Sequence, residues 1–125
     1  MPVVLFAIAS IIVASDAGAQ TDSTALLRRG ERVWKKKECA ACHGIDATGG
    51  APALGGITQR RNREWLYVWL NDSKKMALED STAKELATVY KYTMPKQGLS
   101  RKDADAVLAF IEYRAVKLRE ERGLR

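Results

Sequence analysis

Two cysteines and the one histidine of this chain lie within five residues. The stretch reads Cys39-Ala40-Ala41-Cys42-His43. Two thiols separated by two residues lie about one helical turn apart, so both can bond the edge of one flat cofactor. The imidazole beside the second thiol then lies under the centre of that cofactor, where it can bind a metal ion. The pattern is that of covalent haem attachment, with thioether bonds from Cys39 and Cys42 and with His43 as an iron ligand.

Three other uses of paired cysteines fit this chain less well. A structural zinc site takes about four ligands, and the chain offers only two Cys and one His. A thioredoxin-type redox pair belongs next to a βαβ pattern, and no segment here alternates with the period of a strand. A plain disulfide between Cys39 and Cys42 would leave His43 without a role.

A haem iron has a second axial position, and the composition restricts what can fill it. A second His is excluded, so Met76 and Met94 remain once Met1 leaves with the leader. Met76 lies in a stretch that reads as a polar turn, 73–77. Met94 precedes Pro95, which favours an extended chain that can direct a thioether at a flat cofactor. We therefore favour Met94 as the iron ligand; for either residue the alternative is a buried core Met.

Residues 1–19 have the pattern of a secretory signal. An apolar run from Val3 to Val13 is followed by Ala17-Gly18-Ala19, which fits cleavage after Ala19, although no Lys or Arg precedes the run. The run is shorter than the roughly 20 residues needed to span a bilayer, so we favour cleavage over retention as a membrane anchor. We expect one domain over residues 20–125 of an exported protein.

The formal net charge of +6 restricts the class of partner. Removal of residues 1–19 would raise it by one unit, because Asp16 is the only charged side chain there. A basic chain favours an acidic protein partner or an anionic membrane surface. Nucleic acid is not expected, because an exported chain rarely meets it and no motif for it is present. Basic residues beside the cysteine motif are the candidate docking surface, with a solvated helix face as the alternative: Lys35, Lys36, Lys37, Arg60, Arg61, Arg63 and Lys96.

The remaining pattern is helical, and the period of two that marks a strand is absent. Four helices are expected: about 23–38, 62–70, from 81 or 82 to a point before Pro95, and 100–117, with a frayed charged tail over 118–125. The predicted caps are Ser23 or Asp22, Thr82 in a capping box with Glu85, and Ser100. Between the first two helices, residues 44–56 form a glycine-rich loop that can fold tightly against a flat cofactor.

Taken in order, these features resemble a small class I cytochrome c with one haem, over nearly all of residues 23–116. The resemblance is carried by Cys39 to Gly44, by Met94-Pro95 about fifty residues later, and by the closing helix pattern from Leu99 to Ile111. It implies the all-α class I cytochrome c fold: about four helices wrapped around one covalently attached haem c, with the first and last helices packed together. It also implies attachment of the haem outside the cytoplasm, and therefore a periplasmic location.

The resemblance extends to residues around the cofactor. It implies that Gly30 and Trp34 on the first helix pack against Phe110 on the last. It implies that the backbone carbonyl at Pro52 accepts the ring N–H of His43. An aromatic residue on the middle helix lines the haem or bonds a propionate in this family; Trp65 and Trp69 are both candidates, with core packing as the alternative for each.

The function implied by this ligand set is electron transfer, because His43 and Met94 would fill both axial positions of the iron. We expect a one-electron carrier between redox partner proteins, with no catalytic residues of its own. Two alternatives remain at this point. The chain is an electron-transfer subunit of a larger oxidoreductase, or it is a sensor or peroxidase whose iron is open because Met94 does not bind it.

Overall fold

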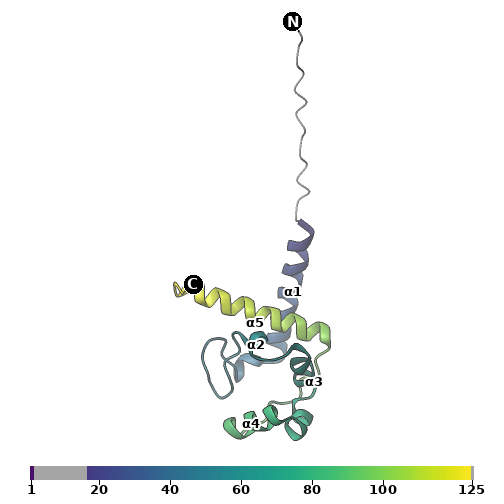
Figure 1. The fold of residues 1–125 in the computed structure, drawn as a ribbon, viewed down its shortest axis with the longest axis vertical. Helices are drawn as coiled ribbons and strands as arrows, with labels where there is room; N and C mark the ends of the chain where they lie inside the picture. The colour runs from purple at the N-terminus through teal and green to yellow at the C-terminus, as the bar shows by residue number, and fades with distance from the viewer. Residues whose placement is uncertain (2–16, 125) are drawn as a thin grey trace.

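The computed structural model of the chain describes Met1 and residues 17–124, and helices make up most of it (Figure 1). In chain order they are α1 (Ala17–Lys36), the 3-10 turn η1 (Cys39–Ala41), α2 (Ile57–Arg60), α3 (Arg63–Glu79), α4 (Ser81–Tyr90) and α5 (Arg101–Glu121). No strand occurs among the described residues, which confirms the all-α prediction. The four expected helices are α1, α3, α4 and α5, and the sequence missed only the short α2.

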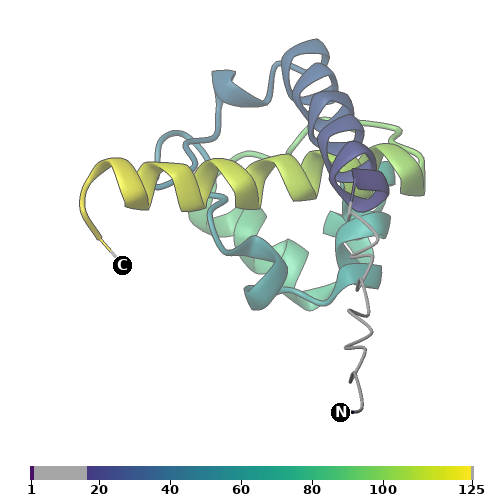
Figure 2. The same cartoon turned by 90° about the horizontal axis from the view of Figure 1, so that it is seen from above.

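The first and last helices cross and pack against each other, as Figures 1 and 2 show from two directions. Gly30 lies at the crossing: a Cβ there would lie 2.0 Å from the carbonyl oxygen of Ala106 and 2.6 Å from Cβ of Phe110. The rings of Trp34 and Phe110 lie beside it with centroids 6.1 Å apart. The expected packing of Gly30, Trp34 and Phe110 is confirmed, and the glycine is there because no side chain fits.

Helix α5 supplies much of the core. Ser100 caps its first turn by accepting from the backbone N–H of Asp103, as predicted. The buried face repeats at helical spacing and packs with Leu99 from the preceding segment: Ala104, Val107, Leu108, Ile111 and Ala115. The helix continues to Glu121. The expectation of a frayed tail from residue 118 is therefore wrong for residues 118–121. An ion pair from Lys117 to Glu120 and another from Arg122 to Asp46 hold this end.

The start of α1 also differs from the expectation. The helix begins at Ala17 rather than near Ser23, so Ser23 and Asp22 lie inside it and do not cap it. The hydroxyls of Ser23 and Thr24 donate back to the carbonyl of Gln20. This local bonding lets hydroxyl residues lie within a helix rather than at its start. The predicted leader falls mostly on residues 2–16, outside the described residues.

Helix α3 is longer than expected, because it resumes after a kink. Asp72 has φ −141° and ψ 77°, and the helix then continues to Glu79. The carboxylate of Asp72 accepts from the N–H of Lys75, which restarts the helix. The interpretation of 73–77 as a polar turn is wrong: Ser73 and Met76, three residues apart on one helix face, are both buried.

Helix α4 begins with a different cap from the one predicted. Asp80 caps it by accepting from the N–H of Ala83, so the Thr82 capping box is wrong. The bond from Ala83 is the main reason that the pKa of Asp80 lies below its usual value, and a hydrogen bond from Trp65 lowers it further. Val89, near the end of this helix, is exposed. In the described part of the chain, every helix is too short or too polar to cross a bilayer.

The crossing at Gly30 gives a stability prediction. We expect Gly30→Ala to destabilise the loaded protein by about 1–3 kcal/mol, because the new methyl group meets a backbone carbonyl that cannot rotate away. This outweighs the gain of up to about 1 kcal/mol that alanine brings to a helix interior. Denaturant unfolding measures the change, and Gly49→Ala is the control, because a Cβ there meets only the carbonyl oxygen of Cys42 at an ordinary 3.4 Å. A Gly30→Ala protein as stable as the parent would contradict the close contact.

Candidate haem site

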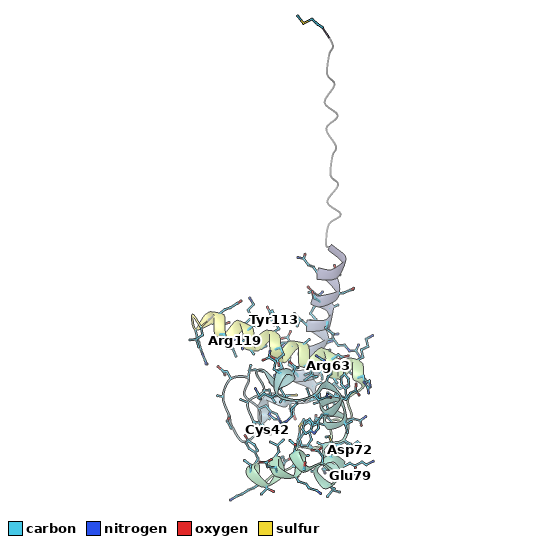
Figure 3. All side chains as sticks on the ribbon, viewed as in Figure 1. Cys42, Arg63, Asp72, Glu79, Tyr113 and Arg119 are labelled. Carbon is cyan, nitrogen blue, oxygen red and sulfur yellow. The ribbon has the colours of Figure 1, made fainter. Side chains whose placement is uncertain are left out.

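A cavity of about 420 Å³ lies between the segment after α1 and the segment before α5. Its volume is in the range of cofactor sites, about 300–1,000 Å³. In the view of Figure 3, the label of Cys42 lies between α5 above it and α4 below it. The cysteine motif, the Met94 segment and a set of apolar side chains all line this cavity: Cys39, Cys42, His43; Met94, Pro95, Trp69; and Leu54, Val107, Leu108, Ile111.

The turn η1 places the two thiols. The chain leaves α1 through Glu38, whose φ of 53° turns it sharply. The backbone N–H groups of Cys42 and His43 then both donate to the carbonyl of Cys39, at 3.2 and 3.0 Å. Both thiols are free of any disulfide, with Cys39 half-buried and Cys42 exposed. Burial raises the pKa of the Cys39 thiol.

The imidazole of His43 is oriented by the glycine-rich loop. Its Nδ1 lies 2.8 Å from the carbonyl oxygen of Pro52. A carbonyl only accepts, so Nδ1 carries the proton in this contact and Nε2 keeps its lone pair. The loop is tied back by the N–H of Leu54, which donates to the carbonyl of Gly44 at 3.0 Å. The contact implied by the resemblance is therefore present, and it leaves Nε2 available to bind a metal ion.

The structure separates the two candidate methionines. Met94 lines the cavity, and its sulfur lies 3.1 Å from the indole Nε1 of Trp69. Met76 is buried and does not line the cavity, so it packs in the core. Met94 is also held through its backbone, because the hydroxyl of Ser73 donates to its carbonyl at 2.7 Å.

The two tryptophans of α3 stack on each other and both line the cavity, with centroids 5.3 Å apart and planes 12° apart. Their N–H groups have different partners: Trp65 donates to Asp80 at 3.2 Å, and Trp69 donates to the sulfur of Met94. In this structure, the polar end of Trp65 holds the start of α4 and that of Trp69 holds Met94.

The basic residues near the motif are not equivalent. Of Lys35, Lys36 and Lys37, only Lys37 lines the cavity, where its ammonium donates to the carbonyl of Gln97 at 2.7 Å. Lys35 pairs with Glu31 one helical turn back.

The arginines and Lys96 also differ in whether they line the cavity. Arg60 and Arg61 line the cavity; Arg60 donates to the carbonyl of Ala53 at 2.8 Å, and the Arg61 guanidinium lies 5.6 Å from the centroid of the Trp65 ring. Arg63 and Lys96 pair instead with Asp105 and Asp72, at 2.9 and 3.2 Å.

Sequence reasoning missed two residues that support the site, Ser73 and Asp80. Ser73 lies between charged residues and gives no local signal, whereas Asp80 is a helix-capping type that was passed over for Thr82. Within the described residues, no three side chains of His, Cys, Asp or Glu come together as a metal-binding group. The donor set that lines the cavity is one imidazole nitrogen, one thioether sulfur and two thiols, and this is the chemistry that suits a covalent haem.

Comparison with known proteins supports the same interpretation. The cytochrome c family model matches residues 27–114. The solved structure of cytochrome c from Rhodothermus marinus is similar with a TM-score of 0.67 and 26% identity, covering 94% of this chain and 91% of that chain. An engineered cytochrome c from the same organism, bound to a carbene intermediate, is similar with a TM-score of 0.62 and 28% identity, covering 93% and 91%.

Among curated proteins, a nitric oxide reductase subunit of Stutzerimonas stutzeri is 26% identical over 101 residues. The match covers 75% of this chain and 62% of that relative, so it spans less than two thirds of the relative's length. The cytochrome c fold, with its first and last helices packed together, is confirmed by the structural matches. The chain belongs to the cytochrome c family.

Proposed function

We propose that this chain is a periplasmic one-electron carrier whose haem c is bound through Cys39 and Cys42 and ligated by His43 and Met94. The observation that carries the proposal is a single cavity lined by both the cysteine motif and Met94. When bound, the haem supplies one-electron exchange between Fe(II) and Fe(III). The chain's own residues supply the attachment, the ligands and an apolar enclosure.

Each side chain has a definable task in this proposal. The Pro52 carbonyl fixes the tautomer of His43 and makes Nε2 a stronger donor. The sulfur of Met94 is neutral, which favours the reduced iron relative to a charged ligand. His43 and Met94 would together hold the iron and leave it no open position for substrates or gases, which favours electron transfer over the sensor or peroxidase alternative.

A second candidate is that the chain serves as the electron-transfer subunit of a larger oxidoreductase. The likeness to a subunit of nitric oxide reductase supports it. The identity is low and the match is partial, so the catalytic partner is not implied by it. Purification of the tagged chain from its native membranes and periplasm distinguishes the two: a carrier elutes alone, whereas a subunit elutes with a stoichiometric partner.

The location and the partners follow from sequence and charge. The secretory pattern over residues 1–19 supports export; cleavage after Ala19 would give a periplasmic protein, and retention would give one anchored at the membrane. Lys37 and Arg61 at the rim of the cavity, together with the net positive charge, support an acidic docking surface on the partner, with an anionic membrane surface as a further attraction.

The ligand assignment is tested by comparing two methionine variants. We expect the ferric parent protein to show the sulfur-to-iron absorption band at the red end of the spectrum. Met94→Ala should lose this band and bind carbon monoxide when reduced. Met76→Ala is the matched control: it should keep the band and lose about 2–5 kcal/mol of unfolding free energy, because a buried side chain is removed. A parent without the band, or a Met94→Ala protein that keeps it, contradicts the proposal.

The tryptophan that donates to Met94 should tune the reduction potential. Its N–H draws electron density from the sulfur, which disfavours the ferric state, so Trp69→Phe should lower the potential. We expect a shift of roughly 20–60 mV, equivalent to about 0.5–1.5 kcal/mol for one hydrogen bond. Trp65→Phe is the control, since it removes the same N–H from a residue that donates to Asp80 instead. Equal shifts in the two variants would mean that the sulfur contact has no electronic effect.

The charge at the cavity rim should steer anionic partners. We expect Lys37→Glu to slow oxidation of the reduced protein by hexacyanoferrate(III) about two- to fivefold at low salt, and the difference should vanish at high salt. Lys35→Glu makes the same change of charge at a residue that does not line the cavity, and should slow the reaction less. Stopped-flow absorbance measures both rates. Equal slowing by the two variants would indicate a net-charge effect and no defined docking site.

A further inference from the structure

The segment that carries Met94 is bound to α3 mainly at the kink, and the bond from Lys37 to Gln97 holds it on another side. We call residues 94–99, between α4 and α5, the Met94 strap. The backbone N–H groups of Gly98 and Leu99 donate to the carbonyls of Asn71 and Leu70, at 3.0 and 3.2 Å. These carbonyls lie immediately before Asp72, the one residue of α3 with non-helical backbone angles. Asp72 and the end of α3 at Glu79 are both labelled in Figure 3.

The kink makes this docking possible. In a regular helix the carbonyls of residues 70 and 71 accept from the N–H groups of residues 74 and 75. Here the N–H of Lys75 donates to the side chain of Asp72 at 3.1 Å, which leaves the carbonyl of Asn71 to the strap. An interrupted helix therefore offers backbone acceptors that a continuous helix would use internally.

Ser73, the next residue, holds Met94 itself. Its side chain has no exposed surface, and it is the one buried polar side chain among the described residues. Its hydroxyl donates to the carbonyl of Met94 at 2.7 Å. Trp69, four residues earlier, donates to the sulfur of the same methionine. One helix thus holds Met94 at both its backbone and its side chain.

The ion pair between strap and kink is weaker than these hydrogen bonds. Lys96 pairs with Asp72 at 3.2 Å, but the Lys96 side chain is 57% exposed, and exposed pairs contribute little. The Ser73 bond is part-buried, and its donor belongs to a residue with no exposed surface. Opening of the strap would leave that buried hydroxyl without its partner until water enters.

We propose that Ser73 is a positioning residue that keeps Met94 on the iron, and that the kink at Asp72 exists to present it. The inference rests on the proposed ligation of iron by His43 and Met94. Ser73 does not touch the iron; it acts through the backbone of Met94, by favouring the closed strap over an open one in which the sulfur has left.

The test measures how often the strap opens. Carbon monoxide binds the reduced iron only after Met94 leaves, so its binding rate at saturating concentration reports the opening. We expect Ser73→Ala to increase this rate about tenfold, while the ferric sulfur-to-iron band persists at rest. Thr88→Ala is the matched control, since it removes a hydroxyl that donates to Lys84 within exposed α4, and its rate should equal that of the parent.

Each outcome has a defined meaning. A Ser73→Ala rate within twofold of the parent overturns the positioning role, even if the protein is less stable, because a merely structural residue would lower stability without opening the strap. A parent that lacks the band and binds carbon monoxide as fast as Met94→Ala overturns the proposed ligation instead. Should Ser73→Ala fail to fold, Asp72→Ala at the kink should increase the rate about two- to fivefold, and an unchanged rate there overturns the inference.

Discussion

In the proposed ligand set, two residues far apart in the sequence, His43 and Met94, bind one iron from the walls of a single cavity, and the rest of the structure positions them. Neither residue lies on a long helix. Their positions are therefore set by hydrogen bonds from other segments: Pro52 orients the imidazole, and α3 holds the methionine. An isolated loop would lose much conformational entropy in adopting either geometry, so both are supported by a rigid scaffold.

The crossing of α1 and α5 provides that scaffold. Helix α1 leads into the cysteine motif within three residues of its end, and only Ser100 separates the Met94 strap from α5. Gly30 lets the two helices approach to backbone contact. The cysteine motif after α1 and the Met94 strap before α5 therefore both adjoin one fixed helix crossing. Leu99, at the junction of strap and helix, packs with Val107 and Ile111 and ties the strap to the core.

What the sequence could predict about the site was local or countable. The C-x-x-C-H motif needs five residues, the preference for Met94 follows from Pro95, and the absence of a second His follows from composition. What it missed depended on distant partners. Ser73 reads as one polar residue among lysines, and its role appears only through a bond to a residue 21 positions later.

The errors in the helix boundaries have the same origin. Asp80 and Thr82 both suit a helix cap, and in the fold Asp80 also accepts from the indole of Trp65, which no local pattern contains. Likewise α3 passes through a polar stretch because Ser73 and Met76 face inward at a spacing of three, while the lysines between them stay in solvent.

The arrangement also suits electron transfer on physical grounds. Both proposed ligands are neutral, so neither has to gain or lose a proton when the charge of the metal changes. His43 is restrained by a backbone carbonyl, and Met94 is restrained at its carbonyl and at its sulfur. Ligands that are already oriented need little movement in either oxidation state, and a preorganised polar environment costs no reorganisation at the moment of transfer. Restraint of Met94 by two side chains of α3 is therefore as much a part of the function as the sulfur itself.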